Sequence, residues 1–134
     1  MKALFILNDP PYGTERTYNG LRLANNVFKK NESAQVTIFL MGDAVSAAKA
    51  GQQTPNGYYN LERMLKGLIA RGGKVLLCGT CMDARGLHEQ ELLEGSRRST
   101  LDELTELTLV AEKLLVFYKE KGPCLRRYSS LEPG

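Results

Sequence analysis

The chain has 134 residues, of which 43% are hydrophobic and 25% charged, and its formal net charge at pH 7 is +3. A chain of this length forms one domain and buries a core without metals or disulfides, and its three cysteines exclude a complete disulfide framework. The net charge is small, lysines and arginines are interspersed with acids, and we interpret Arg97-Arg98 and Arg126-Arg127 as solvated surface, so we expect no nucleic-acid partner.

The first predicted element is a buried strand over residues 2–7, because the run is continuously apolar. Only five apolar residues, Ala3 to Leu7, precede the break at Asn8. That run is too short for the core of a signal peptide or for a membrane span. We therefore expect a cytoplasmic protein with no membrane partner, in a compartment that keeps thiols reduced.

The next elements alternate between helix and strand. Thr14 is predicted to cap a helix that runs to about Lys30, and a second buried strand follows over 35–40. A short alanine-rich helix is expected over 44–50, with Asp43 as its cap. After a loop over 51–59, Asn60 is predicted to cap a helix over 61–70, which Gly72-Gly73 end.

The second half of the chain continues the alternation. A third buried strand is predicted over 74–78, and a short helical segment around 88–93. Thr100 and Glu103 form a capping box for a helix of about a dozen residues. A last strand is predicted over 114–118. Residues 119–134 show no periodicity, so we expect one domain over 1–118 and a loose tail.

Strands that alternate with helices of this length predict an α/β fold, a three-layer sandwich with a mostly parallel sheet of about five strands, flavodoxin-like or Rossmann-like. In such a sheet, ligands bind just beyond the carboxyl ends of the strands. Three loops then become candidates for the functional site, and each contains glycine and a polar or reactive group: residues 8–13, 41–43 and 78–81.

Several kinds of site are disfavoured by spacing. The chain contains neither a Walker phosphate loop nor the G-x-G-x-x-G dinucleotide fingerprint, so we expect no nucleotide cofactor. Six residues separate Cys78 from Arg85, whereas the phosphate loop of a cysteine phosphatase has five between its Cys and its Arg. A closed zinc site at Cys78 and Cys81 would also need His88 and Cys124, and Cys124 lies in the predicted tail. We expect no metal, and His88 as a surface or cap residue.

Three interpretations of the segment Cys78-Gly-Thr-Cys81 stay open. It lies at a strand-to-helix junction, as a thioredoxin-like dithiol does, although Leu77 replaces the usual aromatic residue and no proline lies between the cysteines. Alternatively Cys78 is a single reactive thiolate, favoured by the backbone amides that follow it and by Arg85. The third possibility is a buried and inert cysteine.

The chain resembles the DsrE/TusD-like (DsrE/F-like) sulfur-relay family over about residues 1 to 118. The resemblance rests on four segments in order: Asn8-Asp-Pro-Pro-Tyr-Gly-Thr14, Phe39-Leu-Met-Gly-Asp-Ala-Val45, Cys78 to Gly86, and Leu114-Leu-Val-Phe117. It implies the same α/β fold, a persulfide on Cys78, which lies eight residues before Gly86, and assembly as a homotrimer or hexamer. Cys81 is an additional thiol relative to the family pattern.

The resemblance and the residues together give our first hypothesis, a cytoplasmic sulfur carrier or sulfurtransferase. Cys78 would exchange sulfane sulfur with donor and acceptor proteins, Arg85 would favour the anion, and Cys81 would release the sulfur by forming a disulfide. The predicted pocket consists of Asn8, Asp9, Tyr12, Gly13, Gly42, Tyr58 and Gly79. The alternatives are a dithiol redox protein that uses Cys78 and Cys81, and an oligomeric small-ligand or protein-binding protein without turnover, in which Tyr58-Tyr59 make a subunit contact.

Overall fold

A computed structural model describes residues 1–119 and holds a five-stranded sheet in the order β4-β3-β2-β1-β5. Every pair of neighbouring strands is parallel. The strands are β1 (Lys2–Leu7), β2 (Gln35–Leu40), β3 (Lys74–Cys78), β4 (Ser96–Ser99) and β5 (Lys113–Phe117). The α/β class and the sheet of five strands are confirmed.

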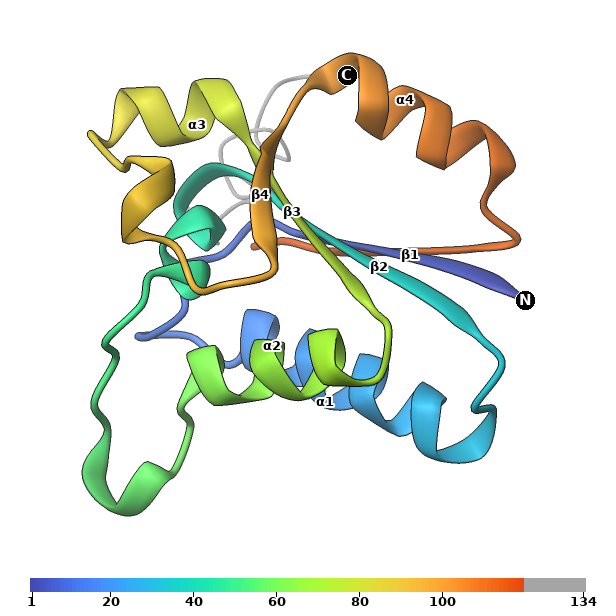
Figure 1. Ribbon diagram of the computed structural model, residues 1–134, viewed down its shortest axis with the longest axis horizontal. Helices are drawn as coiled ribbons and strands as arrows, with labels where there is room; N and C mark the ends of the chain where they lie inside the picture. Colours follow the sequence, from blue (N-terminus) through green and yellow to red (C-terminus); the bar gives the residue numbers. More distant parts are fainter. Residues whose placement is uncertain (120–134) are drawn as a thin grey trace, which may run out of the picture.

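The helices cover both faces of this sheet, as Figure 1 shows. One face carries α1 (Arg16–Lys30) and α2 (Leu61–Ala70), and the other carries α3 (Gly79–Ala84) and α4 (Leu101–Val110). Three short 3-10 segments complete the fold: η1 (Gly42–Ala48), η2 (Pro55–Gly57) and η3 (Glu89–Glu91). This arrangement is the predicted three-layer sandwich.

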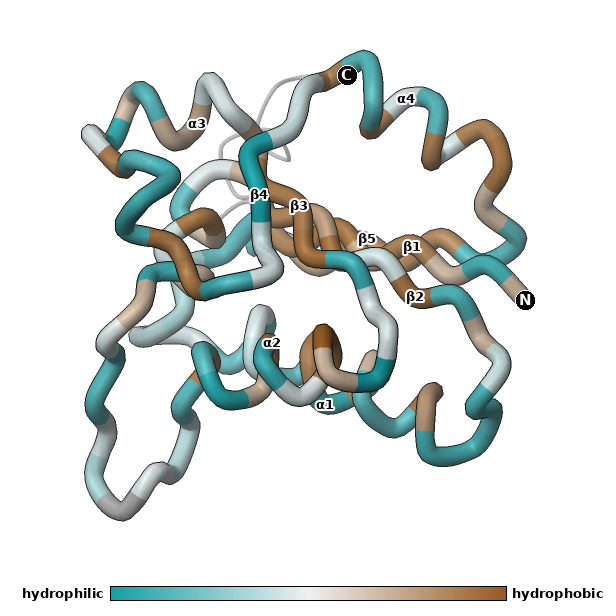
Figure 2. Tube along the Cα trace, in the orientation of Figure 1, coloured by the Kyte–Doolittle hydropathy of each residue, from teal (hydrophilic) through white to brown (hydrophobic). Residues whose placement is uncertain are grey.

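The apolar residues concentrate in the strands at the centre of the sandwich (Figure 2). The larger cluster lies between the sheet and the α1–α2 layer, and it contains Phe5, Leu21 and Leu65, all with no exposed surface. A smaller cluster on the α4 face consists of Leu4, Phe39, Leu76 and Leu104. Leu104 is the only buried residue of α4, so this helix is weakly packed on the sheet.

Three predicted boundaries were wrong for identifiable reasons. The α1 helix begins at Arg16 after Glu15, which makes no side-chain cap; the Thr14 hydroxyl instead donates to Asp9. Asp43 likewise makes no cap, because its carboxylate binds Arg85. The alanine-rich segment expected as a helix over 44–50 is the 3-10 segment η1.

The region after β3 differs most from the sequence prediction. The helix there is α3, which begins immediately after Cys78, whereas the segment predicted around 88–93 is only the single turn η3. Strand β4 was not predicted, because its sequence, Ser-Arg-Arg-Ser, has no apolar pattern. The Thr100 cap is confirmed, since its hydroxyl accepts from the Glu103 amide. The last strand begins and ends one residue earlier than predicted.

Within residues 1–119, no helix combines the length and the apolar character needed to cross a membrane. The predicted tail, apart from Lys119, and Cys124 within it lie outside the described residues.

Candidate functional site

The three candidate loops start at the same level of the sheet edge. Leu7 of β1 pairs with Leu40 of β2, and Leu40 pairs with Leu77 of β3. Asn8 and Met41 therefore follow the ends of β1 and β2, next to Cys78, the last residue of β3. Parallel strands in register bring their carboxyl ends together, and this edge is where open α/β sheets bind ligands.

Cys78 is half-buried at the junction between β3 and α3. Its Sγ accepts a hydrogen bond from the backbone N–H of Cys81 at 3.3 Å, and the Thr80 hydroxyl lies 3.3 Å from the same sulfur. The Cys81 N–H can stabilise negative charge on this sulfur, and the Thr80 hydroxyl can do the same when it is the donor.

Cys81 lies one helical turn after Cys78, and the two sulfur atoms are in bonding contact. Their Cα atoms are 5.2 Å apart, within the range that a disulfide requires. The pair can therefore close into a disulfide without a change in the backbone. This arrangement fits both the dithiol interpretation and a resolving role for Cys81.

Arg85 binds the loop that follows β2. Its Nε donates to Asp43 at 2.8 Å, and its Nη1 donates to the carbonyl oxygen of Cys81 at 3.1 Å. Gly42 stands between the first loop and this guanidinium: a Cβ there would lie 3.4 Å from the Asn8 carbonyl oxygen and 4.0 Å from Nη2 of Arg85. The guanidinium thus ties α3 to the end of β2, and it holds the Cys81 end of the dithiol in place.

A second arginine, Arg98 of β4, packs against residues 78–81, which we call the Cys78 loop. A Cβ on Gly79 would lie 2.7 Å from Nε of Arg98 and 2.9 Å from the Ser99 carbonyl oxygen, so only glycine allows this approach. Arg98 forms a bidentate pair with Asp83 of α3, with N–O distances of 2.7 and 2.9 Å. This hydrogen-bonded pairing lowers the pKa of Asp83 and raises the pKa of Arg98.

The other residues of the first loop have structural contacts. Asp9 is buried, and its carboxylate accepts from Thr14 and Arg16 while its carbonyl oxygen accepts from Thr17. Gly13 has a φ of +96°, which L residues rarely adopt, so it serves the turn. These contacts fix the chain between β1 and α1.

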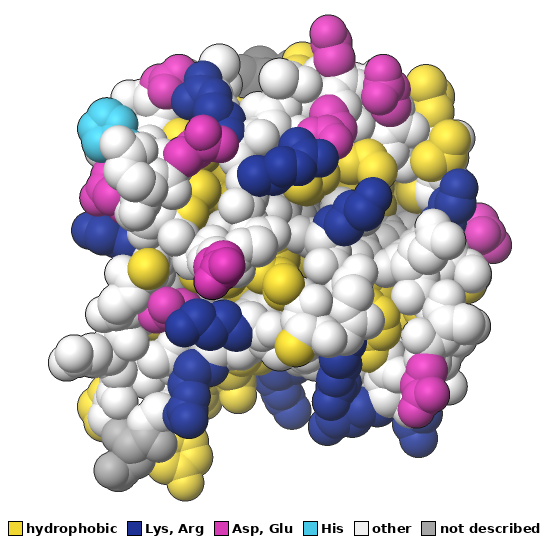
Figure 3. Space-filling view, viewed as in Figure 1, with side chains coloured by type: hydrophobic (Ala, Val, Ile, Leu, Met, Phe, Trp, Pro, Cys, Tyr) yellow, Lys and Arg dark blue, Asp and Glu magenta, His cyan; other side chains and the backbone are white. Residues whose placement is uncertain are grey.

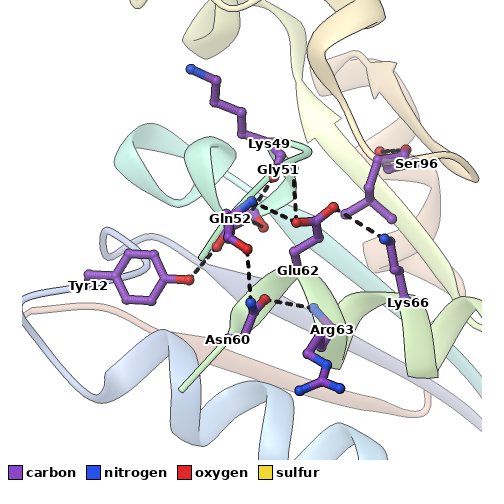
Figure 4. Close-up of polar contacts among 11 residues, drawn as sticks. Tyr12, Lys49, Gly51, Gln52, Asn60, Glu62, Arg63, Lys66 and Ser96 are labelled. Carbon is purple, nitrogen blue, oxygen red and sulfur yellow. Dashed lines mark hydrogen bonds and ion pairs between the residues drawn. The ribbon is translucent and has the colours of Figure 1, made fainter. Parts of the chain in front are cut away.

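Tyr12 belongs to a polar network that Figure 4 shows. Its hydroxyl donates to Gln52, whose side chain donates to the Ala47 and Lys49 carbonyl oxygens. The buried Glu62 accepts from the backbone amides of Gly51 and Gln52. Burial alone raises the pKa of Glu62, but these amides and Lys66 outweigh it and lower its pKa. The network fastens the long 49–60 connection to α2.

Tyr58 lies outside the three loops. It is 72% exposed and lines a groove formed mainly by α1 and α2. The structure therefore brings together six of the predicted site residues: Asn8, Gly42, Cys78, Gly79, Cys81 and Arg85. Tyr12 instead binds Gln52, and Tyr58 lies at the α1–α2 groove. His88 is exposed, and its backbone N–H donates to Glu91. Among residues 1–119, no three His, Cys, Asp or Glu side chains gather in a way that would hold a metal ion.

Sequence reasoning missed two residues at this site. Thr80 lies between the cysteines, and the strand-to-helix junction could have indicated that its hydroxyl faces Cys78. Arg98 carried no usable signal, because the polar strand that holds it was not predicted.

The protein is thus a small parallel α/β domain with a thiol at the end of its third strand. Residues 1–117 match the model of the DsrE/DsrF-like family, and the chain belongs to this family. The protein YchN of Escherichia coli is 40% identical over 116 residues, which cover 87% of this chain and 98% of YchN. Protein MJ0989 of Methanocaldococcus jannaschii is 36% identical over 117 residues, covering 87% of this chain and all of MJ0989.

Solved structures agree with this assignment. The crystal structure of YchN from E. coli superposes with a TM-score of 0.83 at 40% identity, covering 87% of this chain and 99% of that one. Protein MTH1491 of Methanobacterium thermoautotrophicum, of unknown function, has a TM-score of 0.71 at 14% identity over 86% of this chain and 97% of its own. The second likeness concerns the fold alone.

Proposed function

We propose that this protein is a sulfur carrier or sulfurtransferase that holds sulfane sulfur as a persulfide on Cys78. The observation that carries the proposal is the position of Cys78 at the end of β3, with the Cys81 N–H and the Thr80 hydroxyl at its sulfur. Membership of a sulfur-relay-type family supports the same chemistry. The mechanism needs a reduced thiol, and hence a compartment such as the cytoplasm.

The proposed cycle has two steps. In loading, the Cys78 thiolate attacks the outer sulfur of a donor persulfide; the new S–S bond forms on Cys78 and the donor leaves as a thiolate. In delivery, an acceptor thiolate attacks the outer sulfur of the Cys78 persulfide, and Cys78 leaves as a thiolate. No net oxidation occurs, because the sulfane sulfur only changes its carrier.

Cys81 offers a second outcome for the same intermediate. Its thiolate attacks the inner sulfur, the Cys78 Sγ, which forms the Cys78–Cys81 disulfide and expels hydrosulfide. The sulfane sulfur is thereby reduced at the expense of the two thiols, and a dithiol reductant must restore them. The bonding contact of the two sulfur atoms supports this step. In this scheme Arg85 is a positioning residue that acts through the Cys81 carbonyl oxygen.

The test is to load the reduced protein with polysulfide, remove the excess and measure the mass of the intact protein by mass spectrometry. The wild type gains about 32 Da, one sulfur atom, as a persulfide. Cys78→Ser abolishes the gain. Cys81→Ser is the matched control: it loads and keeps the sulfur longer, because no resolving thiol remains. A Cys81→Ser variant that never gains the mass, or a Cys78→Ser variant that still does, contradicts the proposal.

The bonding contact of the sulfurs also favours a dithiol redox role as a second candidate. Alkylation rates separate these functions from binding without turnover. A Cys78 thiol with a pKa near the ordinary value of about 8.5 favours a binding protein, whereas a lower value favours either reactive role.

We further propose that the protein assembles as a homotrimer or hexamer. Leu109 is 80% exposed on α4, and Val116 is 46% exposed on the edge strand β5. Val116 pairs with Ile6, which packs against the apolar cluster that also contacts Cys78, so this surface belongs to the same face of the sheet. Exposed apolar side chains on an edge strand mark an interface.

Light scattering after size exclusion tests the assembly. The double variant Leu109→Arg/Val116→Arg is expected to reduce the molar mass to that of one chain. Asn26→Arg, which adds a charge to the exposed surface of α1, is expected to leave the mass unchanged. A wild type with the mass of a monomer contradicts the proposal.

A further inference from the structure

The cationic side chains of this protein fall into two groups that the net charge conceals. Around the Cys78 loop, Arg85, Arg97 and Arg98 each pair with a carboxylate. On the α1–α2 layer, several cations have no ion-pair partner among residues 1–119; these are Arg22, Lys29, Lys30, Arg63 and Arg71. Figure 3 shows Lys and Arg side chains along the lower edge of the molecule, over these two helices.

Three of these cations line a groove of about 500 Å³ formed by α1, α2 and the segment before α2. The groove is lined by Lys29, Arg63 and Arg71 together with the rings of Tyr18, Tyr58 and Tyr59, and within the described chain no carboxylate lines it. It shares no residue with the loops around Cys78. Its chemistry is that of an anion site with an aromatic wall.

The aromatic wall is held in an unusual backbone conformation. Tyr59 has a φ of +58°, a left-handed value that aromatic residues rarely adopt. The ring of Tyr59 lies 4.4 Å from that of Tyr18, and the Arg22 guanidinium lies over Tyr18 at 5.6 Å. The hydroxyl of Tyr59 donates to Glu15. With Tyr59 fixed in this way, Tyr58 remains 72% exposed.

The position of Arg63 is also defined by the backbone. Gly57 has a φ of +73°, and a Cβ there would overlap Nη1 of Arg63. The guanidinium therefore lies directly against the turn that precedes the two tyrosines. Arg71 donates to the Asn25 carbonyl oxygen at 3.3 Å, which places its charge between α1 and α2. The two arginines thus flank the groove, and no carboxylate of residues 1–119 forms an ion pair with them.

We propose that this groove binds nucleotides, with phosphate on Arg63, Arg71 and Lys29 and the base stacked on Tyr58. An inorganic anion would use the cations alone, and an apolar ligand would use the rings alone. A nucleotide uses both, because it joins a phosphate to a flat aromatic base. The ligand is a free nucleotide or one in a single strand. The fingerprints sought in the sequence concern phosphate loops at strand ends, and the small net charge does not report how charges are distributed.

The test measures binding of a fluorescein-labelled single-stranded 12-mer oligoribonucleotide (a length of about 12 covers one site) by anisotropy. The full chain is expected to bind it at low salt, with a slope of log K against log salt of about −2 for three phosphate contacts. Arg63→Gln/Arg71→Gln is expected to weaken binding at least about tenfold, and Tyr58→Ala about tenfold, whereas Tyr58→Phe retains it. Competition with AMP distinguishes the two sources: displacement identifies the free nucleotide, and its failure identifies the single strand.

Lys2→Gln/Lys113→Gln is the matched control, because it removes the same charge from exposed positions in β1 and β5. This variant is expected to bind within about twofold of the wild type. Its two lysines lie outside the groove, so they act on the phosphates only at long range, where salt screens them. Circular dichroism verifies that each variant is folded. The proposal is overturned if neither AMP nor the oligonucleotide binds, if the control weakens binding as much as the groove variant, or if Tyr58→Ala binds as tightly as the wild type, which would indicate a general polyanion surface.

Discussion

The Cys78 loop and the α1–α2 groove differ in whether their arginines form ion pairs. At the Cys78 loop every nearby arginine is held by a carboxylate: Arg85 by Asp43 and Arg98 by Asp83. In the groove, Arg63 has no such partner among the described residues. Paired arginines fix geometry, whereas unpaired ones remain available to an anionic ligand. The difference indicates that arginines have a structural role at the Cys78 loop and a ligand-binding role in the α1–α2 groove.

The largest effect is expected where an arginine and the backbone approach Gly79. Gly79→Ala places a Cβ against Arg98 and the Ser99 carbonyl oxygen, and backbone cannot move away easily, so we expect a loss of about 2 kcal/mol of unfolding free energy. Urea denaturation measures it. Gly67→Ala is the control: this glycine lies within α2, where a Cβ would meet only Asn25 at 3.7 Å, and alanine is expected to stabilise by about 0.5–1 kcal/mol. Equal effects of the two variants would contradict the packing account.

The next largest effect concerns the buried carboxylate of Glu62. Glu62→Gln replaces the anion that accepts from the Gly51 and Gln52 amides, and we expect a loss of about 1–2 kcal/mol. Lys66→Gln removes only a partner whose side chain is 61% exposed, and its effect is expected to stay below about 0.5 kcal/mol. Thermal or urea unfolding of both variants decides whether the amides or the ion pair stabilise this connection.

A third prediction uses pH to test the paired region. Hydrogen bonds from Arg97 and Ser99 lower the pKa of Glu103 to about 2. Because the folded-state pKa lies below the unfolded value of about 4.5, the stabilisation is complete above pH 4.5 and is lost as the pH falls toward 2. After allowance for solvent screening, the amount is on the order of 1 kcal/mol. Glu103→Gln should reduce the stability at pH 7 and flatten the curve below pH 4.5; an unchanged curve would contradict the assignment.

The smallest effect compares the two kinds of arginine directly. Arg98→Gln is expected to lower the urea midpoint, because Asp83 loses its bidentate partner, while Arg63→Gln leaves the midpoint unchanged since it breaks no ion pair in the described chain. Added salt should weaken the effect of the first variant. If Arg63→Gln destabilises more than Arg98→Gln, the groove arginine has a structural role.

The sequence predicted the elements that carry an apolar signal of their own. Three buried strands and α2 were placed with their observed bounds, because continuous apolar runs and a clear Asn60 cap define them locally. Thr14 shows the limit of this reasoning, since its hydroxyl binds Asp9 instead of the helix. A capping residue with two possible partners cannot be assigned without the fold.

The candidate site was predictable to the same extent. That Cys78 ends a strand at the ligand-binding edge follows from the apolar run before it and from the alternation of helix and strand. The partners of its neighbours did not follow. Asp43 was expected to cap η1 and binds Arg85, and Arg98 reaches Gly79 from a strand too polar to be predicted.

The sequence by itself determined the α/β class, three core strands and the place of Cys78, because local apolar patterns define buried strands and their alternation with helices. Only the tertiary structure decided which charges are paired. Arg63 and Arg98 are both arginines in a chain of small net charge, and nothing in their local sequence separates them. Ion pairing depends on the approach of residues far apart in the chain, such as Asp43 and Arg85, and this approach is a property of the assembled layers.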